Sequence, residues 1–116
     1  MDLTAEDIKI LNREVLLGFW KVHILHHAVQ GPLVGQWMLT ELRRHGYEVS
    51  PGTLYPMLQR MEANGWLRSE VDPQRGPKAA RKYYLTAKGC EILTYIGGQA
   101  EELVRELKEE SHRDLC

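Results

Sequence analysis

The residues best suited to chemistry in this sequence are basic, and they are concentrated in its middle. Nine Lys or Arg and five Asp or Glu fall within residues 40–90, so this segment has a net charge of +4 although the whole chain of 116 residues carries −1. A basic segment between acidic ends can mark the face that meets a polyanion. We expect phosphate contacts from Arg75, Lys78 and Arg81, in and beside a loop rich in Pro and Gly. From charge alone, an unevenly charged solvated surface is an equally good interpretation.

A second group of polar residues lies on one side of a helix predicted over 50–63. Ser50 and Pro51 are typical of a helix start, because Ser can cap the first N–H groups and Pro needs no hydrogen bond at the first position. The residues whose helical spacing places them toward the core are Leu54, Met57, Leu58 and Met61. The residues left on the outward side are Thr53, Tyr55, Pro56, Gln59 and Arg60.

These outward residues carry groups that suit DNA. Thr53 and Gln59 can hydrogen-bond to base edges, and Gln can pair with adenine through two hydrogen bonds. Ser50 and the first N–H groups of the helix can hold a phosphate. Tyr55 either donates to a phosphate or packs at the edge of the helix, and the sequence leaves both roles open. We predict DNA contacts from this helix.

Histidine and cysteine are the other reactive residue types, and their spacing is less informative. His23 and His27 are four residues apart on a predicted helix, a spacing that metal sites use, but no Cys or carboxylate partner is evident. We therefore expect surface or interface histidines, with no metal site and no cofactor. Cys90 is expected to be a small buried residue. No phosphate loop, paired acids or nucleophile–base pattern indicates an enzyme.

The elements that must position these groups follow from the hydrophobic pattern. The pattern predicts helices over about 5–29, 33–45, 50–63 and 86–110, and strands over 66–71 and 81–86. This is the order of a winged helix-turn-helix: mainly α with a small β-hairpin, and an added dimerisation helix at each end. We expect one domain with an N-terminal helix over 1–30, a winged part over 31–86, and a C-terminal helix and tail over 87–116.

The same spacing predicts which side chains of the first two helices are buried. In the first helix the expected stripe is Ile8, Leu11, Val15, Val22, Leu25 and Val29. A second apolar set, which includes Trp20 and Ile24, lies off this stripe and should cover something else, such as a second copy of the chain. In the next helix the expected inward residues are Leu33, Trp37, Met38 and Leu42.

Two segments resemble a known family. Residues 50–58, SPGTLYPML, closely resemble the recognition-helix signature of PadR-like transcriptional regulators, and residues 81–89, RKYYLTAKG, resemble the family's wing exit. The likeness covers about residues 20–90 and implies a DNA-binding transcriptional regulator. Where the family often has L-Y-G-Y-E, this chain has LVGQW at 33–37. Both tyrosines, which lie near the DNA backbone in relatives, are therefore replaced, and Gln36 is the residue left to donate to a phosphate.

The resemblance also implies a homodimer that forms through the terminal helices. The last predicted helix has apolar residues at alternating steps of three and four, as in a short coiled-coil seam. The expected dimer contacts are Val15, Val22, Leu93, Ile96, Ala100, Leu103 and Leu107. Two copies related by a two-fold axis would read half-sites about 10 bp apart on near-palindromic double-stranded DNA.

Compact relatives can hold planar aromatic effectors between subunits, so the resemblance implies a small-molecule effector that relieves repression. Trp20 and Tyr95 are the candidate contacts. The alternative is a winged-helix protein-interaction module or anti-regulator that does not bind DNA, which the nearly neutral charge and the replaced tyrosines favour. The sequence has no signal peptide and no apolar run near the ~20 residues that span a bilayer, so we expect a cytoplasmic protein without a membrane partner.

Overall fold

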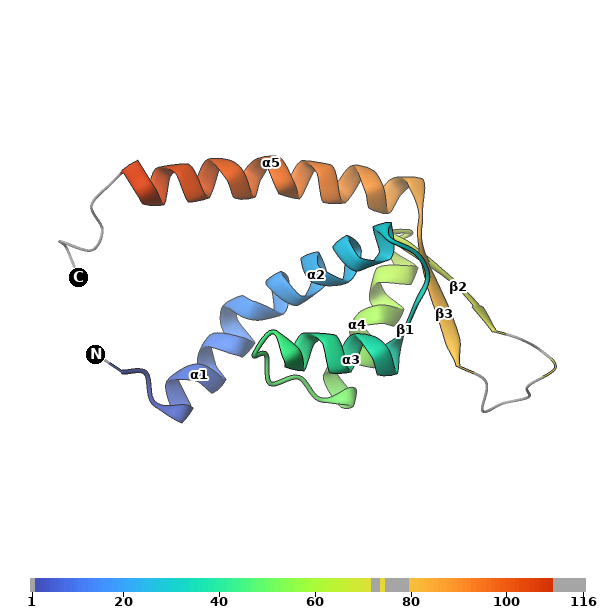
Figure 1. Ribbon diagram of the computed structural model, residues 1–116, viewed down its shortest axis with the longest axis horizontal. Coiled ribbons are helices and arrows are strands. Elements are labelled where there is room, and N and C mark those ends of the chain that lie inside the picture. The colour runs from blue at the N-terminus through green and yellow to red at the C-terminus, as the bar shows by residue number, and fades with distance from the viewer. Residues whose placement is uncertain (1, 72–73, 75–79, 110–116) are drawn as a thin grey trace.

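The computed structural model describes residues 2–71, 74 and 80–109. The elements, in chain order, are α1 (Ala5–Leu11), the π-helical segment η1 (Asn12–Leu16), α2 (Leu17–Val29), β1 (Leu33–Val34), α3 (Gly35–Arg44), α4 (Pro51–Ala63), β2 (Leu67–Val71), β3 (Arg81–Leu85) and α5 (Ala87–Glu109). Helices α2, α3 and α4 pack together beside the sheet, and α5 extends from the body as a long arm (Figure 1). The fold is mainly helical with a small antiparallel sheet, as the sequence predicts.

The N-terminal helical segment begins with a reciprocal cap. Thr4 Oγ1 accepts a hydrogen bond from the Asp7 N–H at 3.1 Å, and the Asp7 carboxylate accepts one from the Thr4 N–H at 3.0 Å. This capping box satisfies two N–H groups that a helix start leaves without partners. It confirms the helix start that the sequence predicts near residue 5.

The stripe predicted for this segment is only partly right. Leu25 is buried and Val22 is half-buried, as predicted, but Val15 and Val29 are exposed. In η1 the Leu17 N–H donates to the Asn12 carbonyl, one residue further back than in an α-helix. The extra residue turns the faces that follow by about 100°. The buried residues of α2 therefore also include Trp20 and Ile24 from the second apolar set, together with Ala28.

Helix α3 begins later than predicted, because the chain stays extended after Gly31-Pro32. Leu33 is buried in β1 rather than in the helix, and Val34 has extended backbone angles. Met38 and Leu42 face the core as expected, together with Leu39. The prediction that Trp37 faces the core is wrong: it is exposed at the edge of α3, where its ring stands edge-on to His27.

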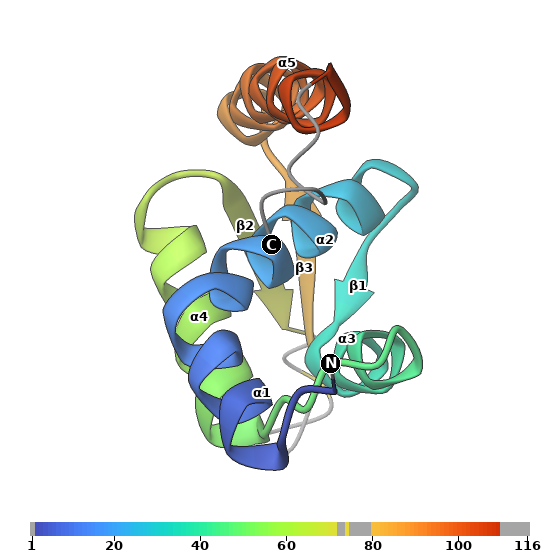
Figure 2. The same ribbon diagram turned by 90° about the vertical axis from the view of Figure 1, so that its left-hand side faces the viewer.

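The expected two-stranded hairpin is part of a three-stranded sheet with the order β1-β3-β2. Both pairings are antiparallel; Leu33 lies opposite Tyr83, and Arg68 lies opposite Tyr84. Figure 2 shows β1 and β2 on the two sides of β3. The strand that the sequence analysis missed is only two residues long, too short to produce a period-two pattern.

Thr86 joins the end of α4 to the start of α5. Its N–H donates to the Trp66 carbonyl at 3.2 Å, and its hydroxyl donates to the Gly65 carbonyl at 2.5 Å. The same hydroxyl accepts from the Gly89 N–H at 2.9 Å. One threonine therefore ties the end of α4, the start of β2 and the start of α5 to each other.

Helix α5 runs unbroken through Gly97 and Gly98. Leu93 and Ile96 are half-buried against the core, whereas all residues from 97 to 109 are exposed. Cys90 is exposed on the side of α5 away from buried Gly89, so the expectation that it is buried is wrong. Within the described residues, no helix has the length and apolar character needed to cross a membrane.

Candidate nucleic-acid interface

Helix α4 is fixed in orientation by its apolar side. Leu54, Met57, Leu58 and Met61 are all buried, as the sequence predicts. Ser50 occupies the N-cap position with Pro51 at the first helical position, also as predicted. The Ser50 side chain makes no capping hydrogen bond to the backbone; its hydroxyl donates instead to Thr53 Oγ1 at 3.2 Å.

The residues expected to contact DNA lie on the other side of α4. Gln59, Arg60 and Pro56 are exposed, and Thr53 is half-buried near the start of the helix. An amide, a guanidinium and a hydroxyl therefore line one face of a helix that is held by its opposite face. A B-form major groove about 12 Å wide admits such a helix.

Tyr55 packs against the start of α3 at Gly35. A Cβ added at Gly35 would overlap the Tyr55 ring, so the glycine permits this close approach of the two helices. The ring is still 38% exposed. Of the two roles left open for Tyr55, packing at the helix edge is therefore observed, while its exposed part remains available to a ligand. Gln36 is exposed in the next position of α3.

The two arginines at the end of α3 act within the protein. Arg43 Nε donates to the Val49 carbonyl at 3.1 Å, directly before the N-cap of α4. Arg44 forms a close ion pair with Glu41, and its guanidinium holds the pKa of the Glu41 carboxyl below the ordinary value. Arg43 thereby sets the path of the α3–α4 connection. The sequence offered no signal for this bond, since its acceptor is a backbone carbonyl.

Arg81 is bound to the stem of the wing. Its guanidinium donates to Ser69 Oγ at 2.9 Å, and that hydroxyl donates to the Glu62 carboxylate at 2.6 Å. This chain of hydrogen bonds links β3 through β2 to α4, so the predicted phosphate contact also positions the wing relative to the recognition helix. Arg81 is exposed and keeps its predicted role open. Arg75 and Lys78 lie outside the described residues.

Tyr83 and Arg68 stabilise the two sides of the same sheet. Tyr83 is buried on the core side, and burial raises the pKa of its hydroxyl. Arg68 lies 4.2 Å from the centre of the Tyr84 ring and pairs with Glu70 at 2.7 Å. A cation over an aromatic ring of this kind is worth about 0.5–1 kcal/mol when exposed.

Helix α3 and the N-terminal end of α4 lie on the side of the molecule away from α5, and β2 and β3 extend from the root of α5 toward that side (Figures 1 and 2). A helix that offers hydrogen-bonding groups and a hairpin beside it form a two-part surface: one part fits a groove and the other reaches the flanking backbone.

Comparison with known proteins agrees with this geometry. The sequence profile of the transcriptional regulator PadR-like family matches residues 24–95. The chain is 50% identical over 87 residues to the transcriptional regulator Rv3488 of Mycobacterium tuberculosis, covering 75% of this chain and 80% of the relative. This protein belongs to the PadR-like family of transcriptional regulators. Members of this family regulate transcription and are not enzymes.

Solved structures place this PadR-like regulator among winged-helix proteins. A PadR family transcriptional regulator from Eggerthella lenta superposes with a TM-score of 0.76 at 26% identity, covering 90% of this chain and 91% of that one. A PadR-like transcriptional regulator from Bacillus cereus gives a TM-score of 0.68 at 28% identity, covering 84% and 99%.

The residues expected at a dimer interface of this PadR-like regulator fall into two groups. Val22, Leu93 and Ile96 are half-buried within the single chain. Val15, Ala100, Leu103 and Leu107 are exposed. Phe19, a member of the second apolar set, is also exposed, and so is Val104, which the sequence analysis did not select.

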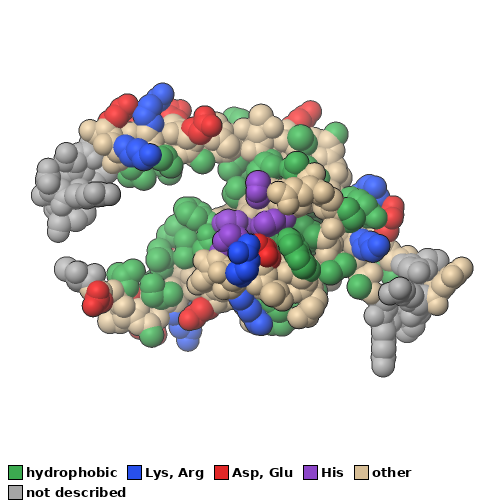
Figure 3. Space-filling model, viewed as in Figure 1, with side chains coloured by type: hydrophobic (Ala, Val, Ile, Leu, Met, Phe, Trp, Pro, Cys, Tyr) green, Lys and Arg blue, Asp and Glu red, His purple; other side chains and the backbone are tan. Residues whose placement is uncertain are grey.

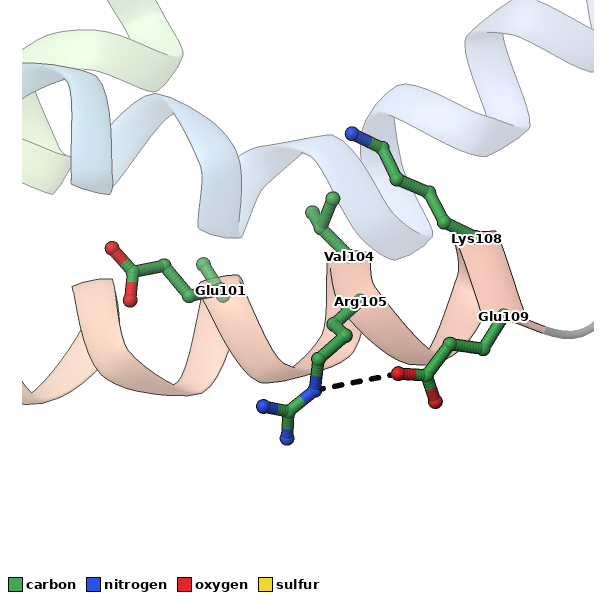
Figure 4. Close-up of a pocket in the computed structure, with 6 residues that line it drawn as sticks. Glu101, Val104, Arg105, Lys108 and Glu109 are labelled. Atoms are coloured by element: carbon green, nitrogen blue, oxygen red, sulfur yellow. Dashed lines mark ion pairs between the residues drawn. The ribbon is translucent and has the colours of Figure 1, made fainter.

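Exposed apolar surface borders a hollow between α5 and the N-terminal helices. Figure 3 shows hydrophobic surface on α5 and on the α1–α2 segment, on the two sides of an open space. On α5 a shallow groove of about 610 Å³ includes Ala100 and Val104, with charged residues along its edge. Val104 and Lys108 point from α5 toward the N-terminal helices, and Arg105 pairs with Glu109 at 3.9 Å (Figure 4).

The two residues expected to contact an effector are not brought together in the single chain. Trp20 is buried and borders a groove of about 560 Å³ that Thr53 and Lys9 also line. Its indole nitrogen finds no hydrogen-bond partner among the described residues. Tyr95 is 68% exposed on α5 and does not line this groove.

Proposed function

We propose that this protein is a homodimeric repressor that binds double-stranded DNA and releases it when a small molecule binds. The observation that carries the proposal is the placement of α4: its apolar residues are buried, its polar residues are exposed, and its N-terminal end lies on the side of the molecule toward which the wing extends. In this arrangement Thr53 and Gln59 read base edges in the major groove. Ser50, Tyr55, Pro56 and Arg60 contact the backbone and groove walls around them.

The remaining contacts are to phosphates. Gln36 donates from α3 and Arg81 from the stem of the wing, and we propose the same role for Arg75 and Lys78, which lie outside the described residues. Phosphate contacts fix the position of a protein on the duplex without reading the sequence, whereas base contacts select it. The two groups should therefore respond differently to substitution.

The second copy of this chain would fill the hollow between α5 and the N-terminal helices. Exposed apolar residues line both sides of that hollow, and a single chain leaves them in water. Burying them gains about 25 cal/mol per Å² of apolar surface. A two-fold axis through this contact presents two α4 helices to half-sites about 10 bp apart on a near-palindromic operator.

For the effector we propose a planar aromatic molecule that contacts Trp20, with Tyr95 supplied across the dimer. The groove beside Trp20 also reaches Thr53, so a ligand there touches the base of the recognition helix. Such molecules should raise the melting temperature of the wild-type protein. Loss of that increase in Trp20→Phe would identify the contact. We place this activity in the cytoplasm.

The test of DNA binding is selection of duplexes from a random pool by the purified protein, followed by affinity measurements at two salt concentrations. Gln59→Ala should lower discrimination at one base position by about 1–3 kcal/mol, the worth of a bidentate contact. Gln30→Ala, an exposed glutamine at the end of α2, is the matched control and should keep the wild-type preference.

An unchanged preference in Gln59→Ala would remove Gln59 from base reading. If no duplex binds even at low salt, the protein is instead an interaction module on a winged-helix scaffold. The replaced tyrosines at positions 34 and 36 are the specific feature that favours this second function.

A further inference from the structure

Three histidines from two helices meet on the face that carries α2 and α3. His23 and His27 lie one turn apart on α2, and His45 is the C-cap of α3. One ring nitrogen from each lies within 4.8 Å of the others. Figure 3 shows the histidine side chains gathered over these helices. The sequence analysis found the first two but could not place His45, which lies 18 residues further along the chain than His27.

Glu41 supplies a carboxylate beside this cluster. Its Oε1 lies 3.4 Å from His45 Nε2 and 4.0 Å from His27 Nε2. The Glu41 side chain is only 12% exposed, so it is held in place beside the histidines. The sequence analysis judged that His23 and His27 lacked a carboxylate partner; in the folded chain Glu41 fills that role.

The distances fit a zinc-like ion after small side-chain movements. A tetrahedral site with metal–nitrogen bonds of about 2.0–2.1 Å needs ligand atoms about 3.4 Å apart. The Glu41–His45 pair is already at this separation. The ring nitrogens lie within 4.8 Å of one another, so they must approach by up to about 1.4 Å, and the His45 side chain, 37% exposed, has room to rotate.

His27 provides an independent reason to expect a ligand. Both of its ring nitrogens are buried, and neither finds a hydrogen-bond partner among the described residues. An unsatisfied buried polar group costs about 1–3 kcal/mol. A bound ion would give one of these nitrogens the partner that it lacks.

The surroundings supply the outer contacts of such a site. His23 Nε2 is hydrogen-bonded to the Tyr47 hydroxyl at 3.1 Å. A partner on one ring nitrogen fixes the orientation of the ring, as outer-shell partners of metal-bound histidines do. Arg44 now pairs with Glu41, but its side chain is well exposed and can turn into solvent. Glu41 is then free to bind the ion, and its charge offsets part of the ion's charge.

We propose that His23, His27 and His45, with Glu41 as the fourth ligand, bind one divalent transition-metal ion of the zinc type per chain. The ion joins α2 to the end of α3. Arg43 lies two residues before His45 and donates a hydrogen bond to the Val49 carbonyl. This bond fixes the backbone directly before α4. The bound ion therefore fixes the connection that positions the recognition helix, without touching DNA.

The experiment is titration of the full-length, metal-free protein with Zn²⁺, followed by calorimetry and by an increase in melting temperature, in the absence of DNA. We expect one ion per chain. Loss of an outer-shell partner costs about 10–100-fold in metal affinity, so removal of a direct ligand should cost at least about tenfold. His27→Ala should show this loss, and so should His45→Ala, at a more exposed position that tolerates substitution.

Two controls separate this site from other histidines. His26→Ala removes the exposed neighbour of His27 and should leave the affinity unchanged. The double variant His112→Ala with Cys116→Ser, outside the described residues, should also bind normally. With Co²⁺ in place of Zn²⁺, the strong visible absorption of a tetrahedral site should appear in the wild type and disappear in His45→Ala.

The proposal is overturned if the protein binds no Zn²⁺. It is equally overturned if His27→Ala and His45→Ala keep the wild-type affinity, or if either control loses as much affinity as they do. Because no DNA is present, these results do not depend on whether the protein proves to be a DNA-binding repressor.

Discussion

Gly89 shows how a single residue allows α5 to pack closely against the segment that follows α4. It is buried in the first turn of α5, where a Cβ would overlap the Trp66 carbonyl oxygen and lie 2.7 Å from Leu85 Cδ1. The obstacle is backbone, which cannot move aside as a flexible side chain can. The Thr86 hydrogen bonds form at the same place, so the helix and the strand cannot separate without losing them.

We expect Gly89→Ala to lower the free energy of unfolding by about 1–3 kcal/mol, the usual cost of overpacking. Gly97→Ala is the matched control on the same helix, where nothing lies within 4 Å of an added Cβ. That substitution should raise stability by up to about 1 kcal/mol, because Ala favours helix more than Gly. Urea unfolding of both variants checks the pair, and equal effects of the two substitutions would contradict this account of the packing at Gly89.

At this scale the sequence identifies residue faces better than residue partners. The inward and outward sides of α4 follow from helical spacing, because the helix is regular from Pro51 to Ala63. The bonds of Arg43 and Arg81 do not follow, since their acceptors lie on other elements. His45 and Glu41 are missed for the same reason: their proximity to α2 is a property of the tertiary packing.

At the scale of elements, the π-helical segment η1 is the largest departure from the predicted pattern. Hydrophobic spacing is read on the assumption of 3.6 residues per turn. One extra residue in η1 breaks that assumption, so the stripe counted from Ile8 continues into α2 only in part, at Val22 and Leu25, while Val29 is exposed. The helix ends are predicted better, because capping residues such as Thr4 and Asp7 act within a few positions.

The cap of α1 makes a pH-dependent prediction. The hydrogen bonds from the Thr4 backbone and hydroxyl hold the pKa of the Asp7 carboxyl below its ordinary value near 3.8. A lowered folded-state pKa contributes stability that is present above that value and is lost as the pH falls through the folded pKa. The start of α1 should therefore fray in acid, which amide NMR signals of residues 4–8 can follow. Asp7→Asn should remove this pH dependence while leaving the Thr4 side of the cap in place.

The outer half of α5 makes a second prediction at this scale. Leu103 and Leu107, 56% and 52% exposed, continue the side of α5 on which Ile96 meets the core. If a second copy covers them, Leu103→Glu and Leu107→Glu should each shift the dimer toward monomer in sedimentation, by tenfold or more in dissociation constant, since burying an unpaired charge is costly. Thr94→Glu adds the same charge on another side of α5 and should leave the assembly unchanged. A monomeric wild type would rule out this interface.

At the scale of the whole molecule, net charge and local charge lead to different expectations. The chain carries −1 overall, yet the segment that forms the recognition helix and the wing is basic. The acidic remainder lies largely in the terminal helices, and α5 lies on the other side of the molecule from the proposed DNA face (Figure 1). Attraction to phosphate therefore depends on which face approaches the duplex.

DNA binding should accordingly depend strongly on salt, and the basic face of the protein should be the one that meets the duplex. The logarithm of the binding constant falls by about 0.9 per phosphate neutralised for each tenfold rise in salt. Arg60→Ala should weaken binding to all duplexes and reduce the salt slope by about 2 for a dimer, one phosphate from each chain. Arg105→Ala, an exposed arginine of α5, should change neither. A salt slope unaffected by Arg60→Ala would show that this residue faces no phosphate.

Because the hydrogen bonds of Thr86 connect the start of α5 to the end of α4, a movement of α5 is transmitted to α4. The arm of 23 residues is about 34 Å long. A tilt of about 5° at its root moves its tip by about 3 Å. In the proposed dimer, a small displacement where the two tips meet would conversely rotate each α4 against its partner. The spacing of the half-sites would then be set at the far end of the molecule, tens of ångströms from any base.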